Sequence, residues 1–137
     1  MSYSMNVKIS AIFLLILFSS SSFSETFSCT IKSHVKTNDD GEAVLSASKS
    51  IYFGNKFKVS VITGDIEGGG VGNMGMPNRA VHVVDPGMAV NIVTTRGGAF
   101  GYLTDLLVID TWVKSYEKPF DYYISGFGYF TGLCNRL

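Results

Sequence analysis

The sequence has few of the residues from which metal and nucleic-acid sites are usually built. Its 137 residues include 2 cysteines and 2 histidines, and these do not form the close ligand pairs that zinc sites show. Acidic and basic residues balance at 11 each, so the chain also lacks the clustered basic excess of a nucleic-acid surface. We therefore expect no metal, no other cofactor and no nucleic-acid partner.

Motifs that bring a nucleophile and a base together are also missing. The chain contains neither G-x-S-x-G nor H-E-x-x-H. Asp105 and Asp110 are separated by an odd number of positions, which places them on opposite faces of a strand. A catalytic site assembled only by folding would leave no such trace, but the residues themselves predict a protein that is not an enzyme.

Only one long apolar run is present, and it lies at the start of the chain. Lys8 precedes the apolar residues 9–18, which Ser10 alone interrupts, and a tract rich in serine follows. This order is typical of a secretory signal peptide, and the run is shorter than the roughly 20 residues of a membrane-spanning helix. We expect residues 1–24 to be a cleaved signal peptide. Residues 25–137 then form one periplasmic or secreted domain without a membrane span.

The two cysteines lie near opposite ends of this domain. In an exported chain an even number of cysteines is most simply read as a disulfide, here between Cys29 and Cys134. Free or metal-bound thiols are the alternative. Closing a loop of about 100 residues stabilises a protein by about 4 to 5 kcal/mol on chain-entropy grounds, so this bond would be a large share of the stability of a small domain.

Alternating apolar and polar residues predict an all-β fold. Residues 57–61 show the clearest alternation, with every second residue apolar. If Thr63 and Gly64 form a two-residue turn, Val61 lies opposite Ile66, and both side chains share one face. Gly64 suits such a turn because glycine tolerates a positive φ angle.

The first strand of the domain is predicted over residues 26–36. Phe27 and Cys29 lie on its apolar face, and strict alternation puts His34 on the opposite face with the lysines. We therefore expect His34 to contact solvent. Residues 51–53 predict another short strand that runs into a turn.

The second half of the chain predicts more strands. Residues 79–85 and 88–95 alternate or are rich in β-branched residues, whereas residues 99–117 also show leucines at helical spacing, so that a helix is the alternative to a strand there. Trp112 is expected to pack in the core or at a barrel mouth. The whole pattern predicts a small antiparallel β-barrel or sandwich of roughly 7 to 9 strands, with its ends joined by the disulfide.

Residues 68–77 are rich in glycine and match the letters G-x-G-x-x-G. That motif binds a dinucleotide only where a helix begins within it, and the proline and asparagine that follow oppose a helix. We interpret the segment as a loop on a β scaffold, where binding residues often lie, and expect bulky residues at Gly70 and Gly72 to weaken binding with little loss of thermal stability. The candidate binding loop comprises Gly68, Gly69, Gly70, Gly72, Asn73 and Met74.

Aromatic residues gather in the last predicted segment of the chain. They are suited to line a ligand cavity or an interface, although ordinary core and surface positions are the alternative. The candidate aromatic surface comprises Tyr122, Tyr123, Phe127 and Tyr129. With the glycine-rich loop, it predicts a binding module that recognises a protein or a small apolar ligand.

Short motifs spread along the chain resemble a group of small exported bacterial β-proteins without an assigned activity. The resemblance implies an extracytoplasmic β-protein and assigns no catalytic residue. The motifs are Phe27-x-Cys29, Phe57-x-Val59 with Thr63-Gly64, Lys118-Pro119-Phe120 and Thr131-Gly132-x-Cys134.

A second segment, Ser48-Lys49-Ser50-Ile51-Tyr52, is similar to the S-G-x-x-Y motif of periplasmic lysozyme inhibitors. Those proteins are small β-barrels with a disulfide, and one of their loops enters the lysozyme cleft. Here Lys49 replaces the glycine, and no T-K-G segment follows. The resemblance implies inhibition of a lysozyme-like enzyme as an alternative function, beside a structural role in the cell envelope.

Overall fold

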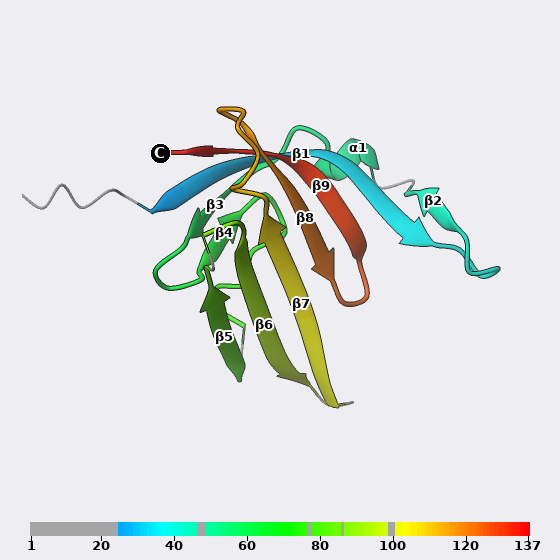
Figure 1. Ribbon diagram of the computed structural model, residues 1–137. Coiled ribbons are helices and arrows are strands. Elements are labelled where there is room, and N and C mark those ends of the chain that lie inside the picture. Colours follow the sequence, from blue (N-terminus) through cyan, green and yellow to red (C-terminus); the bar gives the residue numbers. More distant parts are fainter. Residues whose placement is uncertain (1–24, 47–48, 77, 86, 99–100) are drawn as a thin grey trace, which may run out of the picture.

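The computed structural model describes residues 25–46, 49–76, 78–85, 87–98 and 101–137 (Figure 1). The predicted signal peptide, residues 1–24, therefore lies outside the described residues. Across the described ranges, no helix has the length and apolar character needed to cross a membrane.

The described residues form one antiparallel sheet of nine strands and a single helical turn. The sheet order is β4-β3-β1-β9-β8-β7-β6-β5, and β2 also pairs with β1. Figure 1 shows that the sheet curls into a half-barrel, which confirms the predicted all-β antiparallel fold. The elements are β1 (Thr26–Thr37), β2 (Ala43–Leu45), α1 (Lys49–Tyr52), β3 (Lys56–Ser60), β4 (Ile66–Gly68), β5 (Arg79–Val84), β6 (Val90–Gly98), β7 (Gly101–Ile109), β8 (Lys118–Ile124) and β9 (Gly128–Arg136).

The predicted disulfide is confirmed. Cys29 and Cys134 lie directly opposite each other on the neighbouring strands β1 and β9, and their sulfur atoms are bonded across 105 positions of sequence. Both residues are fully buried. The bond therefore fastens the first and last strands of the domain at the centre of the sheet.

The core lies on the concave side of the sheet, where alternate side chains of neighbouring strands meet. Phe57 of β3 packs edge-on against Phe120 of β8, with ring centres 5.2 Å apart. Each large apolar side chain that is fully buried stabilises the fold by about 1.5 to 3 kcal/mol. The largest of these side chains are Tyr122, Phe27, Phe57, Phe120, Phe130, Ile31, Ile66, Ile92, Leu107 and Ile109.

A buried asparagine connects the two ends of the sheet order. Asn73 has none of its surface exposed, and its side-chain amide donates to the carbonyl of Gly64 and to the hydroxyl of Thr94, each at 2.9 Å. Its side-chain oxygen accepts the N–H of Ile66 at 2.7 Å. Side-chain hydrogen bonds thus connect the start of β4 to β6, where no backbone ladder runs.

An ion pair and a glycine complete this connection. Arg79 at the start of β5 donates to Asp65 at 2.7 Å. This bond, with a second from the Thr63 hydroxyl, lowers the pKa of the Asp65 carboxyl. Gly64 packs so closely on β5 that a Cβ atom there would lie 2.3 Å from a methyl group of Val81. The contact therefore requires glycine.

The turn between β3 and β4 is longer than the predicted two residues. Val59 lies opposite Ile66, where the prediction placed Val61, and the Ser60 N–H donates to the Asp65 carbonyl at 2.9 Å. The predicted register is therefore wrong by two residues. Val61, which lies in the turn, and Ile66 in β4 are nevertheless both buried.

A β-bulge in β1 overturns the prediction that His34 contacts solvent. Ile31 lies opposite Gly132, and Ser33 lies opposite the next residue of β9, so Lys32 is an extra residue in the ladder. A bulge reverses the alternation that follows it. His34 therefore points inward and is only 1% exposed.

The short strand predicted at residues 51–53 is also wrong, because this segment belongs largely to α1. Gly54 adopts a φ angle of 82°, a conformation that commonly ends helices. The side chain of Asn55 donates to the carbonyl of Ile51 at 3.1 Å. These two residues favour a helical turn, which brings Tyr52 against the sheet.

The strand alternative for residues 99–117 holds only for the first part of the segment. Residues 99–100 lie outside the described residues, and Gly101–Ile109 forms β7. The chain then leaves the sheet in a loop, so that Trp112 is 61% exposed. Of the two placements expected for Trp112, packing in the core is therefore wrong, because the strand ends before reaching it, and packing at a barrel mouth stays a prediction.

Candidate functional site

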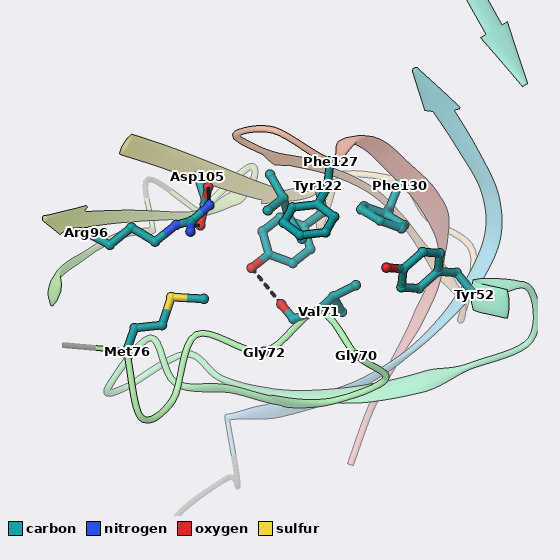
Figure 2. A pocket seen from close by; sticks show the side chains of 11 residues that line it. Tyr52, Gly70, Val71, Gly72, Met76, Arg96, Asp105, Tyr122, Phe127 and Phe130 are labelled. Atoms are coloured by element: carbon teal, nitrogen blue, oxygen red, sulfur yellow. Dashed lines mark hydrogen bonds and ion pairs between the residues drawn. The ribbon is translucent and has the colours of Figure 1, made fainter. Parts of the chain in front are cut away.

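A pocket of about 280 Å³ opens between the glycine-rich loop and the concave side of the sheet (Figure 2). The loop contributes Gly70, Val71, Gly72 and Met76. The sheet contributes Arg96, Asp105, Tyr122, Ile124 and Phe130, and Tyr52 of α1 and Phe127 of the β8–β9 turn complete the wall. Small-molecule pockets usually measure about 300 to 1,000 Å³, so this one lies just below that range.

One end of the pocket is aromatic. Figure 2 shows Tyr52 and Phe130 facing each other there, and their rings meet edge to face with centres 5.0 Å apart. His34 stacks on Phe130 at 4.1 Å, and its Nε2 is hydrogen-bonded to the carbonyl of Phe127 at 2.5 Å. The bulge in β1 thus places an imidazole that supports both the aromatic wall and the turn beside it.

The other end of the pocket holds an ion pair. Arg96 donates from Nε to Asp105 at 3.2 Å and from Nη2 to the carbonyl of Ser125 at 3.0 Å. Asp105 also accepts the Ser125 N–H at 2.9 Å. The Asp105 side chain is 1% exposed and that of Arg96 is 21% exposed. The carboxylate is thus enclosed, whereas the guanidinium reaches the pocket.

Tyr122 connects the sheet to the loop in the middle of the pocket. Its hydroxyl donates to the carbonyl of Val71 at 3.0 Å, as the dashed line in Figure 2 shows. Burial of the phenol, with the nearby charge of Asp105, raises the pKa of Tyr122, although Arg96 opposes this effect. Tyr122 therefore acts as a neutral donor that holds the loop over the cavity.

The two glycines of the loop that line the pocket differ in the space around them. A Cβ atom at Gly70 would lie 3.4 Å from the ring of Tyr52. At Gly72 it would lie 2.8 Å from the carbonyl oxygen of Ile66, which is a clash with the backbone of β4. A bulky residue at Gly72 therefore costs stability. Gly70 adopts a φ angle of 76°, which strains any other residue, so the expected small loss of stability is wrong at both positions.

The pocket brings together members of both candidate sets. Gly70 and Gly72 come from the candidate binding loop, and Tyr122 and Phe127 come from the candidate aromatic surface. The sequence placed these residues about 50 positions apart, and only the curl of the sheet brings them into contact.

Other members of the candidate loop lie away from this pocket. Gly68 and Gly69 pack against the backbone of β3 at Lys56. Asn73 is buried in the connection described above, and Met74 is 50% exposed and is not among the residues that line the pocket. These positions support the loop but do not line the pocket.

Two members of the candidate aromatic surface lie on the outer face of the sheet. Tyr123 and Tyr129 are paired across β8 and β9, with ring centres 4.9 Å apart, and are 36% and 52% exposed. They cannot contact a ligand in the pocket on the concave side. The two tyrosines instead form part of the convex surface.

Sequence reasoning missed the ion pair of Arg96 and Asp105, which forms the polar end of the pocket. Asp105 shares an apolar strand face with Leu107 and Ile109, so its inward position was a signal that a buried partner must exist. Arg96 on the adjacent strand was the available cation. Tyr52 gave no such signal, because its position depends on the helical turn.

Within the described ranges, no group of three histidine, cysteine, aspartate or glutamate side chains is placed to hold a metal ion. Comparison with protein-family models, with curated proteins and with solved structures finds no match to this chain.

Proposed function

We propose that this protein is an exported, non-enzymatic binding module that takes up a small, mainly apolar ligand in the pocket beneath the glycine-rich loop. The observation that carries the proposal is the pocket, with an aromatic end, an ion pair at the other end and walls that come largely from the sheet. The disulfide is consistent with an oxidising compartment outside the cytoplasm.

The size of the pocket sets the size of the ligand. An engineered protein cavity of about 150 Å³ binds benzene, which has six carbon atoms. By proportion, a pocket of about 280 Å³ accepts a molecule of roughly ten non-hydrogen atoms. The ligand is therefore a single ring with a short substituent, or a short branched chain.

The polar groups around the pocket support binding and not chemistry. The carboxylate of Asp105 is engaged by Arg96 and by a backbone N–H, and the hydroxyl of Tyr122 is engaged by Val71. His34 lies behind Phe130 and is hydrogen-bonded to the backbone. None of these contacts pairs a nucleophile with a base.

A pair of loop variants tests the proposal. Met76 is half-buried and lines the pocket, whereas Met74 lies outside it, so Met76→Trp fills the pocket and Met74→Trp is the matched control. Calorimetric titration of residues 25–137, in the oxidised form, with small apolar compounds should detect binding that Met76→Trp weakens at least about ten-fold. Equal affinities in the two variants would show that the pocket is not the site.

The lysozyme-inhibitor alternative rests on a segment that the structure describes only in part. Ser48 lies outside the described residues, and Tyr52 belongs to α1 and lines the pocket. This alternative stays a prediction. An assay of muramidase activity with the oxidised domain present tests it directly.

A further inference from the structure

We infer that the ligand is electrically neutral and carries a hydrogen-bond acceptor, such as a carbonyl, on an apolar body. This inference rests on the proposed function and names the class of molecule that the same pocket selects. It follows from the way in which the charges at the polar end are already balanced.

The charges at the polar end cancel. Arg96 and Asp105 are the two charged side chains among the described residues that line the pocket, and they are joined to each other. In the other ion pair of the described residues, Arg79 and Asp65 are likewise joined to each other. A ligand carboxylate would lose its hydration and would meet a cation that Asp105 already neutralises. An ammonium group would lose its hydration as well, and it would not reach the carboxylate of Asp105, which is enclosed.

The polar end presents a donor to the pocket. The Nε and Nη2 atoms of Arg96 are used by Asp105 and Ser125. Nη1 makes no hydrogen bond within the described part of the chain, and it is not among the buried polar atoms that lack a partner. It is therefore open to a ligand. A neutral acceptor satisfies this donor without adding a charge.

The rest of the pocket fits an apolar body. Val71, Ile124, Phe127 and Phe130 surround the space between the two ends. The hydroxyl of Tyr52 makes no hydrogen bond to the described residues and provides a further neutral polar group, which leaves the charge balance unchanged. Selection among ligands of one size is therefore made by charge at the Arg96 end.

Four compounds of similar size and shape test the inference by calorimetric titration or ligand-observed NMR. They are 4-phenyl-2-butanone, 3-phenylpropanoate, 3-phenylpropylamine and butylbenzene. We expect the ketone to bind at least about ten-fold more tightly than either charged compound, and more tightly than butylbenzene. If the acid or the amine binds as well as the ketone, the inference fails while the proposed function stands. If none of the four binds, the proposed function fails with it.

A charge change within the pocket sharpens the test. Asp105→Asn keeps the shape of the side chain and its ability to accept the Ser125 N–H, but it leaves Arg96 without a counter-charge. The variant should bind 3-phenylpropanoate about ten-fold more tightly than the natural chain does. An unchanged ratio between acid and ketone would overturn the inference, and if the variant does not fold, the four compounds with the natural chain decide alone.

Discussion

The centre of the sheet and its two outer strands are held in different ways. At the centre, β1 and β9 pair along most of their length and share the disulfide. At the edges, the described residues beside β4 make polar or close backbone contacts with β5 and β6 through Asn73, Gly64 and the Asp65 ion pair. The backbone ladder at the centre tolerates the loss of a single side chain, whereas the connection at the edges depends on a few. The pocket wall is attached to this second region, which is therefore the part expected to open first.

The largest effect is expected when the centre is weakened. Replacing both cysteines, Cys29→Ala with Cys134→Ala, should lower the free energy of unfolding by about 4 kcal/mol, because the unfolded chain is no longer closed into a loop. Denaturant unfolding measures the loss. A change under about 1 kcal/mol would mean that the backbone pairing of β1 and β9 holds the centre without the bond.

A smaller effect is expected when the edge connection is cut. Asn73→Ala leaves the Ile66 N–H and the Gly64 carbonyl without buried partners, and should cost about 3 kcal/mol. Asn38→Ala is the matched control, since Asn38 makes similar side-chain bonds to backbone in an exposed loop, where water replaces them. Equal losses in the two variants would contradict the role assigned to Asn73.

A still smaller effect is expected at the pocket. Tyr122→Phe removes the bond to the Val71 carbonyl and should cost about 1 kcal/mol. Amide hydrogen exchange should become faster in residues 69–76 but not in β1 or β9. Tyr123→Phe, on the outer face of the same strand, should change neither quantity. Faster exchange throughout the sheet would show that the loop is not a separate unit.

The smallest effect is expected from acid. Arg79, then the hydroxyl of Thr63, lowers the pKa of Asp65 below its ordinary value of 3.8. A carboxyl whose pKa is lower in the folded state stabilises the fold above its unfolded pKa, and this contribution is lost as the pH falls through the folded pKa. The stability difference between the natural chain and Asp65→Asn should therefore shrink as the pH is lowered from 5 towards 2. A stability difference that stays constant over this range would contradict the stabilising role of the Arg79–Asp65 ion pair.

The sequence was sufficient to predict the fold class, because alternation is visible within a single strand and the two cysteines can form only one bond with each other. Alternation at residues 57–61 and in β5 predicted strands, and two cysteines in a chain expected to be exported predicted one bond. His34 was misplaced because a single extra residue reverses the alternation, and no local signal marks a bulge at Lys32. The segment around Tyr52 was misread because a single helical turn is too short to show a helical period.

Only part of the pocket could be anticipated, and the reason lies in distance along the chain. The glycine-rich loop and the aromatic segment were recognised separately, because glycine and aromatic clusters are visible in the sequence. The hydrogen bond from Tyr122 to Val71, which joins the two segments, depends on the curl of the sheet. The pairing of Arg96 with Asp105 depends on the register of β6 on β7, in which Thr94 lies opposite Asp105, and register is not fixed by either strand alone.

The bulge in β1 has a consequence for how the chain can change in length. In a regular strand, deleting one residue turns every later side chain to the opposite face. Lys32 is the residue that the ladder with β9 leaves out, so its removal restores plain alternation while Ile31 and His34 still face inward. β1 can therefore lose a residue at this one position and keep the same set of interior side chains.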